Sequence, residues 1–200
     1  MADVWENIAE SWDKLRQRPL KIAKEYARIW PKGKILDIGC GNCRNLLPFA
    51  RAGFGCFGLD AYKKMIGLAE QYAEKNSFKV KLKQGTANKI PFSEKFDYCL
   101  LIRVLPAIQN GNERFAILSE MKHVLKNDGR ALVTIWNRAY PKFWFAKHRH
   151  VPWSVGNKKY IRDYYMFWPF EIKNLLRKCG FRIMRTSRFF KQEYWVEVRA

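Results

Sequence analysis

The sequence has few acidic residues, only three histidines and no long apolar run. No stretch approaches the roughly 20 apolar residues that a membrane span needs, so we expect no membrane-spanning segment. The first residues carry acids and no apolar run, which fits neither a secretory signal nor a transit peptide, and a cytoplasmic location is therefore expected. The five cysteines are an odd number, which argues against a disulfide framework.

The shortage of acid leaves the chain strongly basic. Lys and Arg number 38 against 18 Asp and Glu, a formal charge of +20. This exceeds what solubility requires and favours a polyanionic partner, above all nucleic acid. A lysine-rich thermophilic composition would raise glutamate as well, and no separate basic amphipathic helix points to an acidic membrane surface.

Hydrophobic patterns alternate between strand and helix periods after an N-terminal helical segment over 1–33, which Pro19 interrupts. Strands are expected at 34–39, 56–60, 78–84, 96–102, 130–137, 181–190 and 193–198, with helices at 45–52, 62–75, 113–125 and 170–178. The alternation predicts right-handed crossovers and a mostly parallel sheet, while the two-residue link before the last strand permits only an antiparallel hairpin. We therefore predict one α/β domain over 1–200: a Rossmann-like, seven-stranded, mostly parallel sheet with a C-terminal antiparallel hairpin and helices on both faces.

A 32-residue insertion, 137–168, interrupts this rhythm. It holds seven Lys or Arg, ten aromatic residues and a single acid, Asp163. Basic residues interleaved with aromatics are the composition expected of a surface that binds RNA. The insertion is therefore the predicted substrate-binding segment.

A glycine turn follows the first strand, in the run Ile35-Leu-Asp-Ile-Gly-Cys-Gly-Asn-Cys43. Gly39 and Gly41 let the backbone pass close to a ligand, and Asp60 ends the second strand, where a carboxylate accepts ribose hydroxyls. A dinucleotide fingerprint would need a third glycine where Arg44 stands. Asp37 is costly to bury unless it meets a cation, and the ammonium of a methionine moiety would supply one.

This pattern, with the terminal hairpin, resembles motifs I and II of the class I S-adenosylmethionine-dependent methyltransferases. The resemblance implies S-adenosyl-L-methionine as cofactor, with S-adenosyl-L-homocysteine as product. It places the cofactor against Asp37, Gly39, Cys40, Gly41, Asp60, Ala61, Thr86, Ala87 and Ile102. Thr86 stands where the family usually has an acid, and Cys43 where it often has a third glycine.

The competing interpretation makes Cys40 and Cys43 a thioredoxin-like redox pair at a helix start. It leaves Asp37, Gly39 and Asp60 unexplained. A zinc site lacks a second Cys/His pair at ligand spacing, so no metal is expected.

Shorter segments indicate the acceptor. Val151-Pro152-Trp153, the run Arg162 to Phe167 and the stretch Leu15 to Leu20 resemble segments of the tRNA wobble-uridine carboxymethyl methyltransferases. That resemblance implies methyl-ester formation on a modified wobble uridine of tRNA, and a small zinc-ribbon activator beside the lysine-rich strand 78–84. It assigns catalytic, acceptor-side roles to Arg16 and Arg162, and substrate or RNA binding to Arg16, Arg18, His150, Trp153, Arg162, Tyr164 and Tyr165. Arg103 is the third expected catalytic residue, because the end of the strand 96–102 resembles the class I motif IV region that faces the substrate. Pro106 and Tyr165 stand where the wobble-uridine family places histidine.

Two alternatives stay open. The chain could methylate a small acid or amine, with its charge incidental, or it could be a non-catalytic RNA-binding subunit that keeps the methyltransferase fold. Methyl transfer from a sulfonium depends mainly on alignment and exclusion of water, so the lack of an evident catalytic His or Cys does not count against activity.

Overall fold

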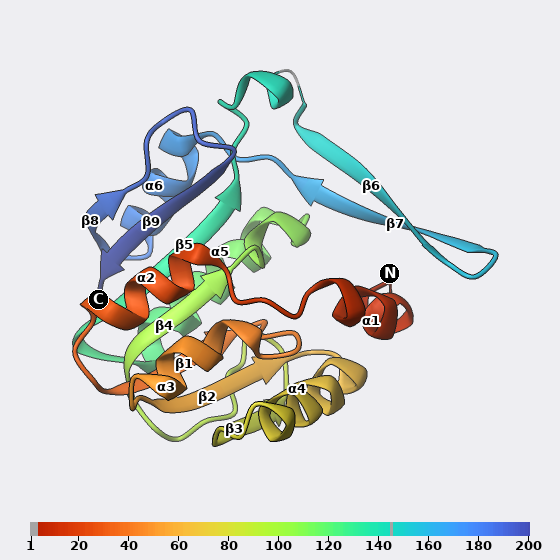
Figure 1. Cartoon of the computed structure of the whole chain (residues 1–200). Coiled ribbons are helices and arrows are strands. Elements are labelled where there is room, and N and C mark those ends of the chain that lie inside the picture. Colours follow the sequence, from red (N-terminus) through yellow and green to blue (C-terminus); the bar gives the residue numbers. More distant parts are fainter. Residues whose placement is uncertain (1–3, 145) are drawn as a thin grey trace.

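A computed structural model describes residues 4–144 and 146–200 (Figure 1). Residues 1–3 of the N-terminal segment and residue 145 of the insertion lie outside the described residues. The strands are β1 (Lys34–Ile38), β2 (Gly55–Asp60), β3 (Val80–Gln84), β4 (Phe96–Ile102), β5 (Leu125–Trp136), β6 (His148–Val155), β7 (Lys158–Tyr165), β8 (Arg182–Thr186) and β9 (Glu193–Arg199). The α-helices are α1 (Val4–Leu15), α2 (Lys21–Ile29), α3 (Leu47–Arg51), α4 (Lys63–Lys75), α5 (Gly111–Val124) and α6 (Pro169–Lys178), with short 3-10 turns η1 (Arg44–Leu46), η2 (Leu105–Ala107) and η3 (Pro141–Phe143).

Seven strands form one twisted sheet in the order β3-β2-β1-β4-β5-β9-β8. The pairings among β1 to β5 are parallel, and β9 runs antiparallel to both β5 and β8. The predicted sheet and its terminal antiparallel pair are thus confirmed. Because β1 pairs with both β2 and β4, the chain changes direction across the sheet at β1, and ligands bind in such folds at the carboxyl ends beside that point.

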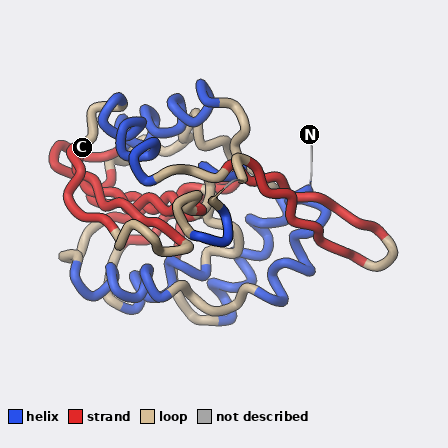
Figure 2. Tube along the Cα trace, turned by 90° about the horizontal axis from the view of Figure 1, so that it is seen from above, coloured by secondary structure: helices blue, strands red, loops and turns tan. Residues whose placement is uncertain are grey.

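Helices cover both faces of the sheet, as predicted (Figure 2). Leu36, Ile38 and Leu101 face a layer built largely from α5 and α6. Ile35 and Leu100 face the other layer, which α2, α3 and α4 supply. Since successive strand residues point to opposite faces, strands buried on both sides need continuous apolar runs, which is the pattern that located β1 and β4 in the sequence.

The C-terminal connection is longer than the two residues predicted. β8 ends at Thr186, so residues 187–192 join it to β9. Phe189 and Phe190, which extended the apparent strand pattern, are 44% and 60% exposed and lie edge to face against each other. These residues belong to a loop that is held by the side chain directly after β5, because Asn137 Nδ2 donates to Phe189 O at 2.6 Å.

The insertion folds as an antiparallel arm that projects beyond the sheet (Figures 1 and 2). β6 and β7 pair from His148 with Tyr165 to Val155 with Lys158, and a two-residue turn at Gly156 and Asn157 closes the arm. Gly156 has φ +55°, which suits such a turn. The arm rests on the N-terminal helix: Trp153 Nε1 donates to Ser11 Oγ of α1 at 2.8 Å. In the described part of the chain, no helix is long and apolar enough to cross a membrane.

Candidate cofactor and acceptor site

The turn after β1 is tied to the end of β2. The backbone amides of Gly39 and Cys40 both donate to Leu59 O, at 2.7 and 2.9 Å. Gly39 has φ +71° and Gly41 φ +55°, in the left-handed region that favours glycine. A Cβ on Gly39 would lie 2.4 Å from Val104 Cγ2, so the turn can pass this close to Val104 only because Gly39 has no side chain.

The two cysteines of this turn are buried, free thiols. Cys43 adopts φ +54°, the conformation that the family's third glycine would take without strain, and its Sγ donates to Ala69 O at 3.3 Å. Burial raises the pKa of both thiols well above the ordinary value. Redox chemistry needs an accessible thiolate, so Cys40 and Cys43 act as small residues that line the turn.

Asp60 closes the turn from the end of β2. Its Oδ2 accepts from Gly41 N at 2.8 Å, and its Oδ1 accepts from Tyr62 N at 3.1 Å. Burial raises the pKa of this carboxyl, while the amide donors oppose the rise. Each carboxylate oxygen has a second lone pair, so Asp60 can still accept from ribose hydroxyls.

Asp37 is the unsatisfied group of the site. It is 1% exposed, and within residues 4–144 and 146–200 its Oδ2 has no hydrogen-bond partner. Burial raises the pKa of Asp37 to about 8; Asp60 adds to this, and Arg44 opposes it. A buried carboxylate in this state needs a cation. The ammonium of S-adenosylmethionine meets that need, so the residues present fit this cofactor.

The other predicted cofactor positions lie at the carboxyl ends of β2, β3 and β4. Ile102 is 8% exposed at the end of β4, and Ala87 packs partly buried against the core. Thr86 and Ala61 are exposed, and Ala61 O accepts from Gln84 Nε2. The structure brings these residues together at the carboxyl ends of the parallel strands, and their contacts with adenosine stay a prediction.

Helix α1 covers the glycine turn, a feature the sequence did not indicate. A Cβ on Gly41 would lie 3.2 Å from Trp12 Cη2, so the Trp12 ring packs directly on the turn. Asn42, which is fully buried, donates through Nδ2 to Asp13 Oδ1 at 2.6 Å and to Arg16 O at 2.9 Å. Movement of α1 is therefore coupled to the shape of the cofactor loop.

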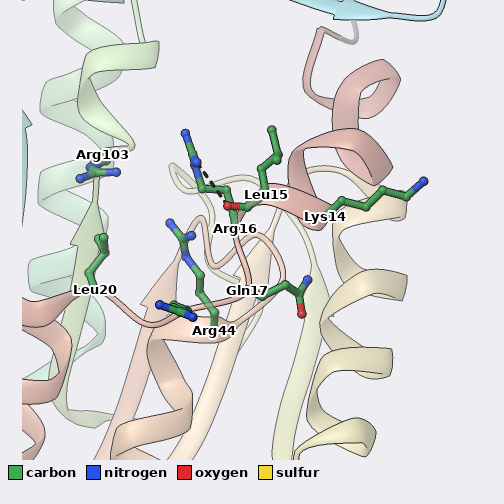
Figure 3. Close-up of a pocket in the computed structure, with 8 residues that line it drawn as sticks. Lys14, Leu15, Arg16, Gln17, Leu20, Arg44 and Arg103 are labelled. Atoms are coloured by element: carbon green, nitrogen blue, oxygen red, sulfur yellow. Dashed lines mark hydrogen bonds between the residues drawn. The ribbon is translucent and has the colours of Figure 1, made fainter.

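Beside this turn lies a cavity of about 410 Å³ (Figure 3). It is lined by Lys14, Leu15, Arg16, Gln17, Arg18, Leu20, Arg44 and Arg103. Two of the predicted catalytic residues, Arg16 and Arg103, thus come together with the predicted RNA-binding residue Arg18, from the α1–α2 linker and the end of β4. Arg44 was not predicted as a site residue, although its position directly after the glycine turn was a signal.

Arg103 is held in a strained backbone conformation, with φ +61°. Its Nε and Nη2 donate to the two carboxylate oxygens of Glu193 at 2.8 and 2.7 Å, and its guanidinium lies 4.8 Å from the centre of the Trp136 ring. Such a bidentate fork fixes both the position and the plane of the guanidinium. Glu193 and Trp136 carried no local sequence signal for this role.

Arg162 does not line the cavity. Its guanidinium lies between aromatic rings of α1 and the arm, 4.6 Å from the Trp153 ring and 5.8 Å from the Trp5 ring, and its Nη1 donates to Tyr164 Oη at 3.3 Å. In this arrangement Arg162 fastens the arm to α1. Its predicted acceptor-side role is not tested by this placement.

The remaining predicted RNA-binding residues are spread along the arm. Tyr164 is 8% exposed and packs against Trp5, so its ring is covered. Tyr165 Oη donates to Glu171 Oε1 at 2.5 Å. His150 is exposed, with Nδ1 3.4 Å from Asp163 Oδ1. His150 is the one of these three that is freely presented to solvent.

Comparison with known proteins agrees with this geometry. The methyltransferase domain family matches residues 35–129. The ubiquinone biosynthesis O-methyltransferase of Rickettsia akari is 33% identical over 118 residues, 59% of this chain and 46% of that protein. The protein of the same name from Rickettsia canadensis is 30% identical over 175 residues, 82% of this chain and 68% of that protein. The chain spans about half the length of several of the curated relatives it matches.

A solved structure shares the fold at low identity. The 1,6-didemethyltoxoflavin-N1-methyltransferase of Burkholderia thailandensis, solved with its substrate and S-adenosylhomocysteine, superposes with a TM-score of 0.71 at 17% identity, covering 96% of this chain and 84% of that one. The two Rickettsia relatives are named for ubiquinone biosynthesis, so the predicted membership of the tRNA wobble-uridine enzymes is not confirmed. The chain belongs to the class I S-adenosylmethionine-dependent methyltransferases.

Proposed function

We propose that the chain transfers a methyl group from S-adenosylmethionine to a small organic acceptor that binds in the cavity beside the glycine turn. The observation that carries this proposal is the position of that cavity, between the turn at Arg44, the end of β4 at Arg103 and the α1–α2 linker. Its volume of about 410 Å³ is that of a small-molecule site. The names of the curated relatives also support a small acceptor over tRNA.

When bound, S-adenosylmethionine supplies an electrophilic methyl group. Asp37 would hold the ammonium, and Asp60 the ribose hydroxyls, from opposite ends of the glycine turn. Trp12 covers the turn, and the arm fixes α1 above it through the bond from Trp153 to Ser11. The chain's own contribution is thus alignment of the acceptor and exclusion of water.

The cavity offers no evident general base. Among the described residues that line it, none is His, Cys, Asp or Glu. An acceptor that is nucleophilic without one, such as a carboxylate or a free amine, needs only to be positioned. Glu193 fixes the guanidinium of Arg103, which gives the cavity one rigid side against which an acceptor can be positioned.

Calorimetry with S-adenosylhomocysteine tests the cofactor half of the proposal. We expect wild-type protein to bind it, and Asp60→Ala to weaken binding by at least about 30-fold, because charge-assisted hydrogen bonds are lost. Asp97→Ala is the matched control. Asp97 also accepts a hydrogen bond from a backbone amide, Lys34 N at 2.8 Å, but it lies at the amino ends of the parallel strands, away from the glycine turn. If wild type ignores S-adenosylhomocysteine, the non-catalytic alternative replaces this proposal. Labelled methyl transfer to a panel of small acids and amines then tests the acceptor half.

RNA is the second candidate acceptor, and the charge distribution favours it. The formal charge is +20, and the projecting arm exposes Arg149, Lys158 and Lys159. Filter binding with bulk tRNA across a salt series checks this. Binding through the arm's cations predicts a steep loss of affinity with salt, and charge reversal at Lys158 and Lys159 should reduce the slope. Weak binding without salt dependence would exclude tRNA as the acceptor. Nucleoside mass spectrometry after incubation of tRNA with labelled cofactor would identify a methylated product.

The zinc-ribbon activator is retained as a proposal. β3 is an edge strand and pairs only with β2 among the described strands. Lys81 and Lys83 are exposed there, and Lys81 lies 3.4 Å from Glu94. An added strand would satisfy the open backbone groups of this edge.

A further inference from the structure

The buried guanidinium of Arg44 has no ion-pair partner among the described residues, and Asp37 acts on it only from beyond ion-pair distance. Arg44 is 7% exposed, yet it lines the cavity. Its guanidinium lies 5.3 Å from the centre of the Trp12 ring. Within residues 4–144 and 146–200, no carboxylate forms an ion pair or hydrogen bond with this guanidinium. Buried charges in proteins are normally paired, so the missing partner needs an explanation.

Like charges surround this group. Five of the eight described residues that line the cavity are cationic and none of the eight is acidic. Burial lowers the pKa of Arg44 to about 10, the neighbouring charges of Arg103 and Arg16 act in the same direction, and Asp37 opposes them. Among the described residues, Glu193 pairs with Arg103, and the side chain of Arg16 donates to a backbone oxygen, Leu15 O at 3.3 Å, and not to a carboxylate. The cavity therefore keeps an excess of positive charge.

The cofactor supplies one carboxylate, which can pair with only one of the five cationic residues that line the cavity. S-adenosylmethionine carries two cationic groups, the sulfonium and the ammonium, against one carboxylate. Its binding adds positive charge near the cavity, and Asp37 is placed to take only the ammonium. An excess of positive charge therefore remains in the loaded site, and it favours an acceptor that carries an anionic group.

We propose that the cavity contains an anion subsite, with Arg44 as its buried contact and Arg16 and Arg103 beside it, that selects acceptors bearing a carboxylate or phosphate group. The proposal rests on the proposed function and narrows its substrate class. The guanidinium of Arg44 lies over the Trp12 ring, and a planar guanidinium binds two oxygens of an anion at once. An uncharged acceptor would leave Arg44 buried and unpaired, which makes the subsite selective against it.

Inorganic phosphate is the probe. Calorimetry in the presence of saturating S-adenosylhomocysteine should detect phosphate binding by wild type, and Arg44→Gln should weaken it by about 10-fold or more. Arg51→Gln is the matched control, since Arg51 is exposed on α3 seven residues farther along. Arg16→Gln is a second test in case Arg44→Gln does not fold. Arg16 lies in the linker between α1 and α2, so we expect this variant to fold and to bind phosphate more weakly than wild type. Wild type that does not bind phosphate, or variants that bind it as wild type does, would overturn the proposal.

A second arm separates the acceptor's anion from the carboxylate of the cofactor. 5′-Methylthioadenosine lacks the amino-acid part of S-adenosylhomocysteine, so the ratio of their dissociation constants reports on that part. We expect Arg44→Gln to leave this ratio within about twofold of wild type, because the contact serves the acceptor. A tenfold loss of the preference for S-adenosylhomocysteine would assign Arg44 to the cofactor and overturn the inference. Failure of wild type to bind S-adenosylhomocysteine at all would instead reject the proposed function.

Discussion

Raising the pH from about 6 to about 8 should tighten the binding of S-adenosylhomocysteine, by up to about tenfold per pH unit. The group responsible is Asp37, whose pKa burial raises to about 8, with Asp60 adding to the rise and Arg44 opposing it. Below that pH the carboxyl is protonated in the free protein. The ligand's ammonium is held by the carboxylate, so binding releases a proton, and a lower proton concentration favours the complex.

The same shift in pKa gives a stability prediction with a definite sign. The folded protein keeps a proton on Asp37 up to a pH of about 8, whereas the unfolded chain loses it near the ordinary pKa of 3.8. Between these two values the folded state binds more protons, so the cofactor-free protein should lose stability as the pH rises through this window. Bound S-adenosylhomocysteine should reduce that loss, because it supplies the cation that the ionised carboxylate lacks.

Calorimetry in two buffers of different ionisation enthalpy measures the released proton directly. Asp37→Asn should bind more weakly at pH 8 and show almost no pH dependence, since the amide does not titrate. Asp97 lies at the amino ends of the parallel strands, so Asp97→Asn should keep the wild-type dependence of binding on pH. A slope that persists in Asp37→Asn would show that another group titrates and that Asp37 does not receive the ammonium.

The parts of the site that the sequence predicted are those fixed by local pattern. Asp37, Gly39 and Gly41 follow a continuous apolar strand, and parallel topology alone brings that strand's end beside Asp60. The geometry of the turn then follows from positive φ at the glycines. These residues lie close in sequence or are joined by the crossover rule, so the sequence predicted the geometry of this turn, and its contact with the cofactor stays a prediction.

The acceptor side was predicted less completely, because it depends on contacts between distant segments. Glu193 holds Arg103 from 90 residues away, and Trp12 covers Gly41 from a helix whose docking no periodicity specifies. The arm had a local signal, the Gly156-Asn157 turn between strand-like runs, which the basic composition of the insertion obscured. Net charge indicated an anionic ligand, but only the structure shows that, among the described residues, no carboxylate forms an ion pair with the buried Arg44.

The second large effect concerns Glu197, a buried carboxylate that joins α2 to the sheet. It is 2% exposed on β9, and it accepts from Tyr26 Oη at 3.2 Å and Trp30 Nε1 at 3.0 Å. Arg130 Nη1 lies 3.7 Å away. Tyr26 and Trp30 are themselves buried, and Trp30 stacks on Tyr98 of β4 with ring centres 4.5 Å apart. Both donors therefore depend on Glu197 for their hydrogen bonds.

Glu197→Ala should lower the free energy of unfolding by about 3 kcal/mol, because it leaves two buried donors unsatisfied and opens a small cavity. For a domain of this size the expected fall in Tm is about 6–12 °C. Glu197→Gln, which keeps the shape and one acceptor oxygen, should lose less. Glu70→Gln, an exposed carboxylate on α4, should change stability by no more than about 0.5 kcal/mol.

Urea unfolding followed by circular dichroism gives these differences, provided the slope with denaturant is shared by all variants. α2 begins where the linker that lines the cavity ends, but that linker has a second anchor, because Leu20 N donates to Asn45 Oδ1 at 3.1 Å. Because that second anchor survives in Glu197→Ala, phosphate affinity of the folded variant should change far less than its stability. Equal losses in both would mean that Glu197 shapes the acceptor site itself, and a loss of stability below about 1 kcal/mol would mean that Tyr26 and Trp30 find other acceptors.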